Sequence, residues 1–206
     1  MKTDNEMIGM FPIPVMASHI GREFTQEEKQ FMMNLPTKLN QGNITTVDKN
    51  ILDHPELKDL RDFVQSKIDV YFNDIICPAS NASIYITQSW LNITEKNHYH
   101  HKHNHSNSYL SGVFYIDTHP SEDKIHFTSN NTNLWPLLID QKEFNVFNSI
   151  DWWLPAQTGK ILLFPSSLTH YVSPVQTDTQ RVSISFNTFL RGDIGNADSA
   201  AGITLP

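Results

Sequence analysis

Five of the ten histidines in this chain lie within eight residues, in the segment HYHHKHNH. These are His98, His100, His101, His103 and His105. Imidazole is a common ligand of iron, zinc, copper and nickel. A solvated loop, or the non-specific metal binding of any histidine-rich tract, explains this segment alone equally well. The segment leads directly into the strand pattern SYLSGVFYI, however, so one or two of its histidines can be held at the mouth of a strand.

A distant histidine and an arginine add to this pattern. His170 follows GKILLFPSSLT, an apolar strand pattern with a turn, and Arg181 opens the next strand across a hairpin. The period of two in that strand places four polar residues on one face, namely Arg181, Ser183, Ser185 and Asn187. In a one-sided sheet this face lies in water, whereas in a closed barrel it lines a ligand cavity. A buried arginine needs an anion, because an unpaired buried charge costs several kcal/mol. A guanidinium pairs well with a carboxylate, and the hydroxyl of Ser183 can donate a second bond.

Together these residues indicate one kind of chemistry. Three protein ligands on one side of Fe(II) leave three open positions. A 2-oxo acid that binds through two atoms fills two of them, and O2 fills the third. Arg181 would then hold the far carboxylate of the acid. Zinc also fits three histidines, but it gives no reason for the arginine.

The first third of the chain predicts helices that cover a sheet. Thr25 and Glu28 form a capping-box pattern before the short helix KQFMMNL. A longer helix begins near Pro55, since proline is favoured in the first helical turn. Its apolar stripe is predicted to be core and consists of Leu57, Leu60, Val64, Ile68, Tyr71 and Ile75.

From residue 82 onward the pattern has the period of strands. Predicted strands are 83–93, 109–117, 124–128, 160–164, 168–173 and 181–190. Many short strands after two helices favour a β-sandwich or small barrel with the helices packed outside. We expect one domain over 1–206, with helical cover and an edge strand in 1–80, the β core in 82–190 and a polar tail in 191–206. The stretch 129–158, with Trp135, Trp152 and Trp153, is expected to form loops over the barrel mouth.

Composition excludes several other classes of protein. The formal net charge is −7, which argues against a nucleic-acid or anionic membrane partner. No run of 18 apolar residues predicts a membrane span, and MKTDNEMIGM lacks the apolar core of a signal peptide. The single cysteine, Cys77, is expected to be a buried structural thiol, so a disulfide framework is excluded. The expected location is the cytoplasm.

Several motifs resemble, in order, a family of 2-oxoglutarate/Fe(II) oxygenases from bacteria and phages with the signature H-x-H-x-x-S-x-x-S-G-V-x-Y. The signature stands here as HNHSNSYLSGVFY, and it is accompanied by MFPIPV, SWLNI, the block from WLP to GKILLFPSSLTHYV, and RVSISFN. The resemblance implies a mainly β fold, a double-stranded β-helix (a cupin-like jelly-roll barrel). It also implies Fe(II), 2-oxoglutarate and O2 as cofactor and co-substrates. The iron ligands implied are His103, His105 and His170, and Arg181, Ser183 and Asn92 would bind 2-oxoglutarate.

Position 105 departs from the wider superfamily, which carries aspartate or glutamate there. The resemblance assigns His105 as the middle ligand, since only the 103/105 register aligns with SGVFY. A carboxylate remains an alternative, although neither Glu95 nor Asp117 has the expected spacing. Among other residues, Tyr115 is interpreted as core packing rather than as a hydrogen-bond partner of the 2-oxo acid, and His126 as a cavity or surface residue. The histidines 98, 100 and 101 are interpreted as loop groups or neighbours of the ligands.

The predicted function is a dioxygenase that oxidises, most simply by hydroxylation, an unassigned prime substrate and releases succinate and CO2. A second hypothesis is a three-histidine cupin-like metalloenzyme that does not use 2-oxoglutarate. A third is a non-catalytic jelly-roll binding module. Replacement of Arg181 by alanine separates the first two, and metal analysis with a succinate-release assay separates the third.

Overall fold

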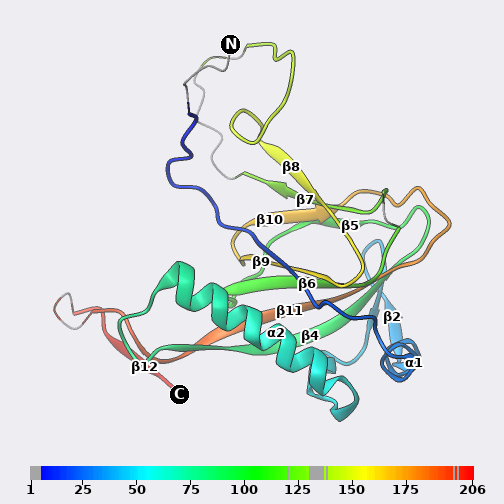
Figure 1. Ribbon diagram of the computed structural model, residues 1–206, viewed down its shortest axis with the longest axis horizontal. Coiled ribbons are helices and arrows are strands. Elements are labelled where there is room, and N and C mark those ends of the chain that lie inside the picture. Colours follow the sequence, from blue (N-terminus) through cyan, green and yellow to red (C-terminus); the bar gives the residue numbers. More distant parts are fainter. Residues whose placement is uncertain (1–5, 120, 130–136, 138, 197, 199) are drawn as a thin grey trace.

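Two antiparallel sheets form the body of the protein (Figure 1). The structure is a computed structural model that describes residues 6–119, 121–129, 137, 139–196, 198 and 200–206. Within these residues, the larger sheet has the strand order β1-β9-β6-β11-β4-β3-β2, with β12 paired to β11. Its strands are β1 (Met16–His19), β2 (Thr37–Leu39), β3 (Ile44–Thr46), β4 (Ser83–Thr94), β6 (Leu110–Asp117), β9 (Lys160–Pro165), β11 (Arg181–Ile194) and β12 (Ile203–Leu205).

The smaller sheet has the order β5-β10-β7-β8. Its strands are β5 (His100–His103), β7 (Lys124–Thr128), β8 (Asp151–Pro155) and β10 (Thr169–Val172). The mainly β fold with helices outside, predicted from the sequence, is confirmed. No helix in the described part of the chain is both long and apolar enough to span a membrane.

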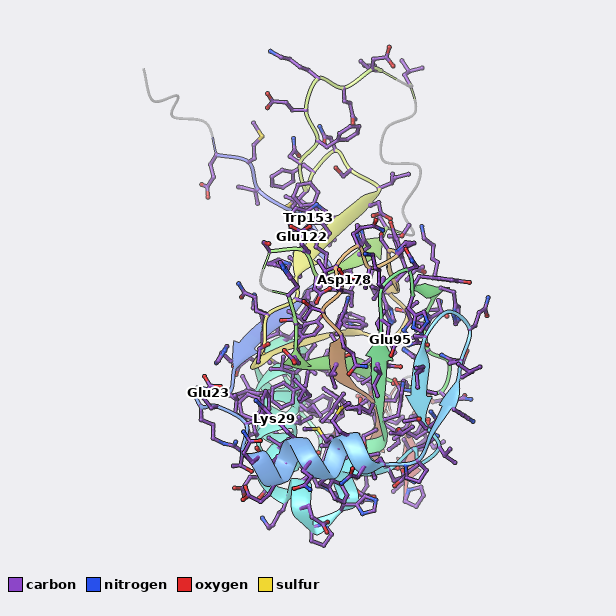
Figure 2. The ribbon with its side chains drawn as sticks, turned by 90° about the vertical axis from the view of Figure 1, so that its right-hand side faces the viewer. Glu23, Lys29, Glu95, Glu122, Trp153 and Asp178 are labelled. Atoms are coloured by element: carbon purple, nitrogen blue, oxygen red, sulfur yellow. The ribbon has the colours of Figure 1, made fainter. Side chains whose placement is uncertain are left out.

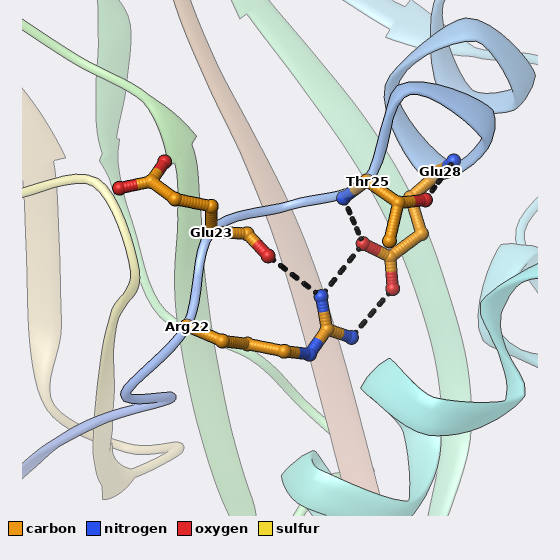
Figure 3. Close-up of polar contacts among 4 residues, drawn as sticks. All are labelled: Arg22, Glu23, Thr25 and Glu28. Atoms are coloured by element: carbon orange, nitrogen blue, oxygen red, sulfur yellow. Dashed lines mark hydrogen bonds and ion pairs between the residues drawn. The ribbon is translucent and has the colours of Figure 1, made fainter.

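The short helix α1 (Gln26–Asn34) begins at the predicted capping box (Figure 3). The backbone N–H of Glu28 donates to Thr25 Oγ1 at 3.1 Å, and the backbone N–H of Thr25 donates to Glu28 Oε2 at 2.8 Å. Arg22 donates to both carboxylate oxygens of Glu28, at 2.9 and 2.6 Å. The helix start is therefore fixed by paired backbone donors that would otherwise lack a partner.

The longer helix covers the outer face of the larger sheet (Figure 1). Short 3-10 turns at Ile51–Asp53 and Pro55–Leu57 lead into α2 (Lys58–Tyr71), which continues as a π-helical turn at Phe72–Ile76. The predicted stripe is buried from Leu57 to Tyr71, but Ile75 is 51% exposed. Its assignment to the core is wrong, because the wider π turn shifts the phase of the stripe.

Cys77 follows this turn and is exposed, so the prediction of a buried thiol is also wrong. Its φ of 49° is in the left-handed region, and its N–H donates to the carbonyl of Phe72. The residue ends the helix and turns the chain away from the core.

Alternation along β11 places its apolar and polar side chains on opposite faces, as the sequence predicts, and the structure has an apolar cluster on each side of the strand. Its apolar residues Val182, Ile184 and Phe186 belong to the cluster beneath the helices. Its polar residues Arg181, Ser183 and Ser185 face the space between the two sheets. A second apolar cluster lies in that space and includes Val113, Phe127, Leu162 and Phe164.

The predicted strands are all present with small changes of boundary, and other strands are added. β8 lies within the stretch expected to be loop, of which Trp135 falls outside the described residues. Strand structure also extends into the segment 191–206, because β11 continues to Ile194 and pairs with β12.

Candidate metal centre

Three histidines converge where β5 and β10 meet. His103 and His170 are direct partners across this antiparallel pair, with ring centroids 4.4 Å apart. His105 follows β5, and its ring lies 5.0 Å from that of His103 and 5.2 Å from that of His170. One ligand atom from each residue lies within 4.8 Å of the other two. No other group of three or more His, Cys, Asp or Glu with this compactness occurs among the residues that the structure describes.

Backbone carbonyls fix the orientation of two of the rings. Nδ1 of His103 lies 2.7 Å from the carbonyl oxygen of His101, and Nδ1 of His170 lies 2.9 Å from that of Leu168. Because a carbonyl only accepts, both Nδ1 atoms must carry the proton. Nε2 of each ring therefore has a free lone pair, which is the form in which histidine binds a metal.

Burial keeps these rings neutral. It lowers the pKa of His170 to about 3 and that of His105 to about 4, and it also lowers the pKa of His103. Neighbouring histidines act in the same direction on all three, because a second positive charge nearby is unfavourable. At neutral pH the cluster offers three unprotonated imidazoles, which fit a divalent cation of the first transition row.

The wall beside the histidines comes from β4 and β11. The cavity that the three histidines line is also lined by Asn92, Ser183 and Arg181. Ser183 is the direct partner of Asn92 across the strand pair. The amide of Asn92 donates to Ser185 Oγ at 2.8 Å and accepts from Asn43 Nδ2 at 3.2 Å. Asn92 therefore lines the cavity with its amide already hydrogen-bonded, and its role toward 2-oxoglutarate stays a prediction.

Arg181 is the only positively charged side chain described in this cavity wall, and it is 3% exposed. Its Nη1 donates to the carbonyl of Lys124 at 2.9 Å, and its guanidinium carbon lies 5.2 Å from the centre of the Tyr115 ring. A guanidinium has five N–H donors, so this one hydrogen bond leaves capacity for a carboxylate. The cavity is narrow, about 30 Å³, so a dicarboxylate must push some wall side chains outward.

For Tyr115 the sequence favours core packing over a hydrogen bond to the 2-oxo acid. The ring is fully buried, as predicted for core packing, but the hydroxyl has no hydrogen-bond partner among the described residues. Burial raises the pKa of Tyr115 to about 12, so the group stays protonated. A buried donor beside a buried guanidinium is suited to a bound carboxylate, because an unpaired buried hydroxyl is costly.

The other singled-out histidines occupy different places. His100 stacks on His103 with centroids 4.5 Å apart and lines the cavity. Nδ1 of His101 is buried without a described partner. His126 alternates with Ile125 and Phe127, which belong to the core between the sheets, so its side chain is on the outer face of the smaller sheet. Neither Glu95 nor Asp117 is part of the compact histidine group.

Serine hydroxyls of the predicted signature form a hydrogen-bond network near His105. No pattern in the sequence predicts this network. The backbone N–H of His105 donates to the carbonyl of Ser166 at 3.0 Å. Oγ of Ser166 lies 2.7 Å from Oγ of Ser108 and 2.8 Å from Oγ of Ser111. Ser111 in turn donates to Asn187 Oδ1 at 2.8 Å. This network, the serine network, ties the segment after β5 to β6, β11 and the β9–β10 turn.

The fold and the histidine group define the class of protein. Two facing antiparallel sheets with an imidazole cluster between them are the double-stranded β-helix of the 2-oxoglutarate oxygenases. Residues 88–187, from β4 to β11, match the profile of the family described as "Putative 2OG-Fe(II) oxygenase". This match covers the β core of the chain and agrees with the resemblance that the motifs indicate.

Solved structures agree on the fold. An oxidoreductase of the 2OG-Fe(II) oxygenase family from Burkholderia pseudomallei is 12% identical, with 78% of this chain and 74% of that chain covered and a TM-score of 0.55. HygX from Streptomyces hygroscopicus, solved with nickel, 2-oxoglutarate and hygromycin B, is 12% identical over 85% and 82%, with a TM-score of 0.56. A prolyl-4-hydroxylase from Pseudomonas putida is 10% identical over 85% and 92%, with a TM-score of 0.52. A search of curated sequences gave no significant match.

Proposed function

We propose that this protein is an Fe(II)- and 2-oxoglutarate-dependent dioxygenase. His103, His105 and His170 would hold the ferrous ion, and Arg181 would hold the distal carboxylate of 2-oxoglutarate. A ferrous ion bound there would supply the oxidising chemistry, in which 2-oxoglutarate and O2 yield succinate and CO2 while a prime substrate is oxidised, most simply by hydroxylation.

The residues of this chain have three tasks in that reaction. Carbonyl contacts at Nδ1 of His103 and His170 orient the ligand nitrogens before any ion binds. Arg181 and Ser183, which both line the cavity, would position the dicarboxylate, and the buried ring of Tyr115 lies against the guanidinium of Arg181 and supports it. The apolar floor from Val113 and Phe164 limits water in the site.

The observation that carries the proposal is the burial of Arg181 in the same cavity wall as the three histidines. A three-histidine metal site alone is compatible with zinc or with a cupin-like enzyme. A buried guanidinium in that cavity is costly without an anion, and 2-oxoglutarate supplies a carboxylate to it. HygX, which shares the fold, was solved with 2-oxoglutarate bound.

Calorimetry and a product assay test the proposal. 2-Oxoglutarate is titrated anaerobically into protein loaded with Fe(II), and succinate release is then followed in air. We expect saturable binding that requires the metal, and succinate formation that rises with the correct prime substrate, screened among small molecules and peptides.

Arg181→Ala and Arg191→Ala are the matched pair for this test. Arg191 is on the same strand and also lies over a tyrosine ring, that of Tyr85, but it does not line the cavity. Arg181→Ala should weaken 2-oxoglutarate binding at least about 100-fold, the usual cost of losing a buried charged hydrogen-bond partner, whereas Arg191→Ala should bind normally. Turnover that persists in Arg181→Ala without 2-oxoglutarate would favour the cupin-like alternative, and absence of metal binding would favour the non-catalytic one.

A further inference from the structure

A second group of reactive side chains lies on the outer face of the smaller sheet. Ser173 follows β10, His126 is in the middle of β7, and Asp151 begins β8. Register brings them together, because His126 is the direct partner of Tyr171 on one side and of Trp153 on the other. None of the three belongs to the metal centre, since their face of the sheet is the opposite one.

Their order in space is that of a nucleophile, a base and an acid. Oγ of Ser173 lies 3.2 Å from Nε2 of His126. Nδ1 of the same ring lies 3.4 Å from Oδ1 of Asp151. A carboxylate only accepts, so Nδ1 carries the proton and Nε2 is left as the acceptor for the serine hydroxyl. Catalytic contacts of this kind are often this long before substrate binds.

Further contacts hold the carboxylate and the ring in place. Asp151 accepts from the hydroxyl of Tyr171 at 3.1 Å and from Thr128 Oγ1 at 2.9 Å. Lys102 Nζ lies 3.7 Å from Oδ2 of Asp151, the oxygen that also accepts from Thr128. The His126 ring stacks on that of Tyr171, with centroids 4.7 Å apart and an angle of 24°. The imidazole is therefore oriented by packing and by a hydrogen-bonded acid, which is the supporting arrangement that a base needs.

A cavity of about 250 Å³ opens at the serine. Ser173 and His126 both line it, together with Lys124, Trp153, Glu122 and Arg181. Figure 2 shows Glu122 and Trp153 close together beside β8. Trp153 provides an apolar wall, and the Lys124 ammonium lies 4.4 Å from the centre of its ring. The cavity thus has room for a small ligand, and the positively charged Lys124 lines it together with Ser173.

From this geometry we infer that Ser173, His126 and Asp151 form a second catalytic site, which hydrolyses small carboxylic esters. Oγ of Ser173 bonds to the carbonyl carbon while its proton passes to Nε2 of His126. The C–O bond to the leaving group breaks, and the alcohol departs with that proton. Water then gives a proton to Nε2 and attacks the acyl-serine, which releases the carboxylic acid and restores the serine. Lys124, whose side chain lines the same cavity, would stabilise the oxyanion, and the reaction needs no oxidant or metal.

A fluorophosphonate probe tests the site directly, because it labels serines that have an activating base. The full-length protein is incubated with the probe, and the labelled residue is located by peptide mass spectrometry. Hydrolysis of p-nitrophenyl acetate is measured in parallel, with and without a chelator. We expect labelling of Ser173 and esterase activity that the chelator leaves unchanged.

Variants connect the signal to the three residues. Ser173→Ala should abolish labelling at this position, and His126→Ala and Asp151→Asn should each slow it at least about tenfold. Ser121→Ala is the matched control, because Oγ of Ser121 also lies 3.4 Å from a histidine nitrogen, Nδ1 of His119, but Ser121 itself does not line the cavity. This control should behave as wild type.

The wild-type protein alone can overturn the inference, whatever the stability of the variants. No label on Ser173, or a label there no faster than on Ser121, contradicts it. Labelling of Ser173 at the wild-type rate in His126→Ala contradicts it as well. Because the dioxygenase reaction depends on the metal whereas labelling and ester hydrolysis at Ser173 do not, its failure and the failure of this site are measured separately.

Discussion

His103 and His170 face each other directly across the antiparallel strands β5 and β10, with ring centroids 4.4 Å apart. Paired residues on adjacent strands are held at a fixed separation by the ladder between them. Sheet register therefore positions His103 and His170, the first and last ligands of the proposed metal centre along the chain. His105 lies on the segment after β5 and depends on other contacts.

Replacement of His170 by alanine should abolish tight metal binding while the fold is retained. The loss should exceed about 100-fold in affinity, because removal of even an outer-shell partner of a metal ligand costs about 10- to 100-fold. Metal stoichiometry after anaerobic loading, with circular dichroism, measures this. His119→Ala, outside the centre, should bind metal as wild type does; undiminished binding in His170→Ala would contradict the ligand assignment.

Stability of the metal-free protein should fall as the pH is lowered from 6.5. Burial lowers the pKa of His100 and His170 to about 3 and that of His105 to about 4, below the ordinary 6.5. In the interval between those values the unfolded chain binds protons that the folded chain does not, so each histidine lowers the free energy of unfolding by up to about 1.4 kcal/mol per pH unit. Urea unfolding between pH 6.5 and 5 measures the slope.

His100→Gln provides the check on this slope. This change removes one of the histidines whose pKa is lowered in the folded protein. The free energy of unfolding should therefore depend less steeply on pH. A wild-type free energy of unfolding that stays constant over the interval would show that these imidazoles are accessible to protons in the folded state.

Ser166→Ala should disturb His105 through the serine network. The change removes the hydroxyl between Ser108 and Ser111, which leaves buried oxygens with fewer partners, at a cost of about 1–3 kcal/mol in unfolding free energy. We expect metal affinity to fall about tenfold as well, because the network holds the segment that carries the ligand. Ser66→Ala, at an exposed serine of α2 whose hydroxyl donates to the carbonyl of Phe63, should change both quantities little. Normal metal affinity in Ser166→Ala would limit the network to a role in stability.

Gly112→Ala should destabilise the fold by about 1–3 kcal/mol. A Cβ at this position would lie 2.2 Å from Cζ of Phe186 and 2.8 Å from Cδ2 of Leu163, both on strands beside β6. Thermal and urea unfolding measure the loss. Gly9→Ala is the control, because a Cβ there meets only Phe147 at an ordinary 3.8 Å. Equal stability of the two variants would mean that Phe186 moves aside easily.

The parts of this fold that the sequence predicts are those with a strong local period. Alternation along 181–185 predicts which side chains of β11 line the cavity, although Asn187 on the same face does not line it, and the stripe from Leu57 to Tyr71 predicts the buried face of α2. The stripe fails at Ile75, because the π turn is a local irregularity that no apolar period announces. Strand β5 carries only histidines and a lysine, so the ladder with β10, rather than its own pattern, makes it a strand.

The sequence predicts those residues of the candidate site that belong to the quoted motifs. The three histidines, Arg181, Ser183 and Asn92 all lie around one cavity. The Tyr115 hydroxyl and the triad of Ser173, His126 and Asp151 depend on tertiary placement across strands, which no spacing in the sequence specifies. Ser108 and Ser111 were visible within the signature, but their contacts with Ser166 required the β9–β10 turn in place.

A crystal structure grown anaerobically with Mn(II) and 2-oxoglutarate tests the central claim most directly. We expect manganese bound by Nε2 of His103 and His170 together with a ring nitrogen of His105, and the distal carboxylate of 2-oxoglutarate on the guanidinium of Arg181. A metal bound elsewhere, or a co-substrate whose carboxylates do not reach Arg181, would contradict it.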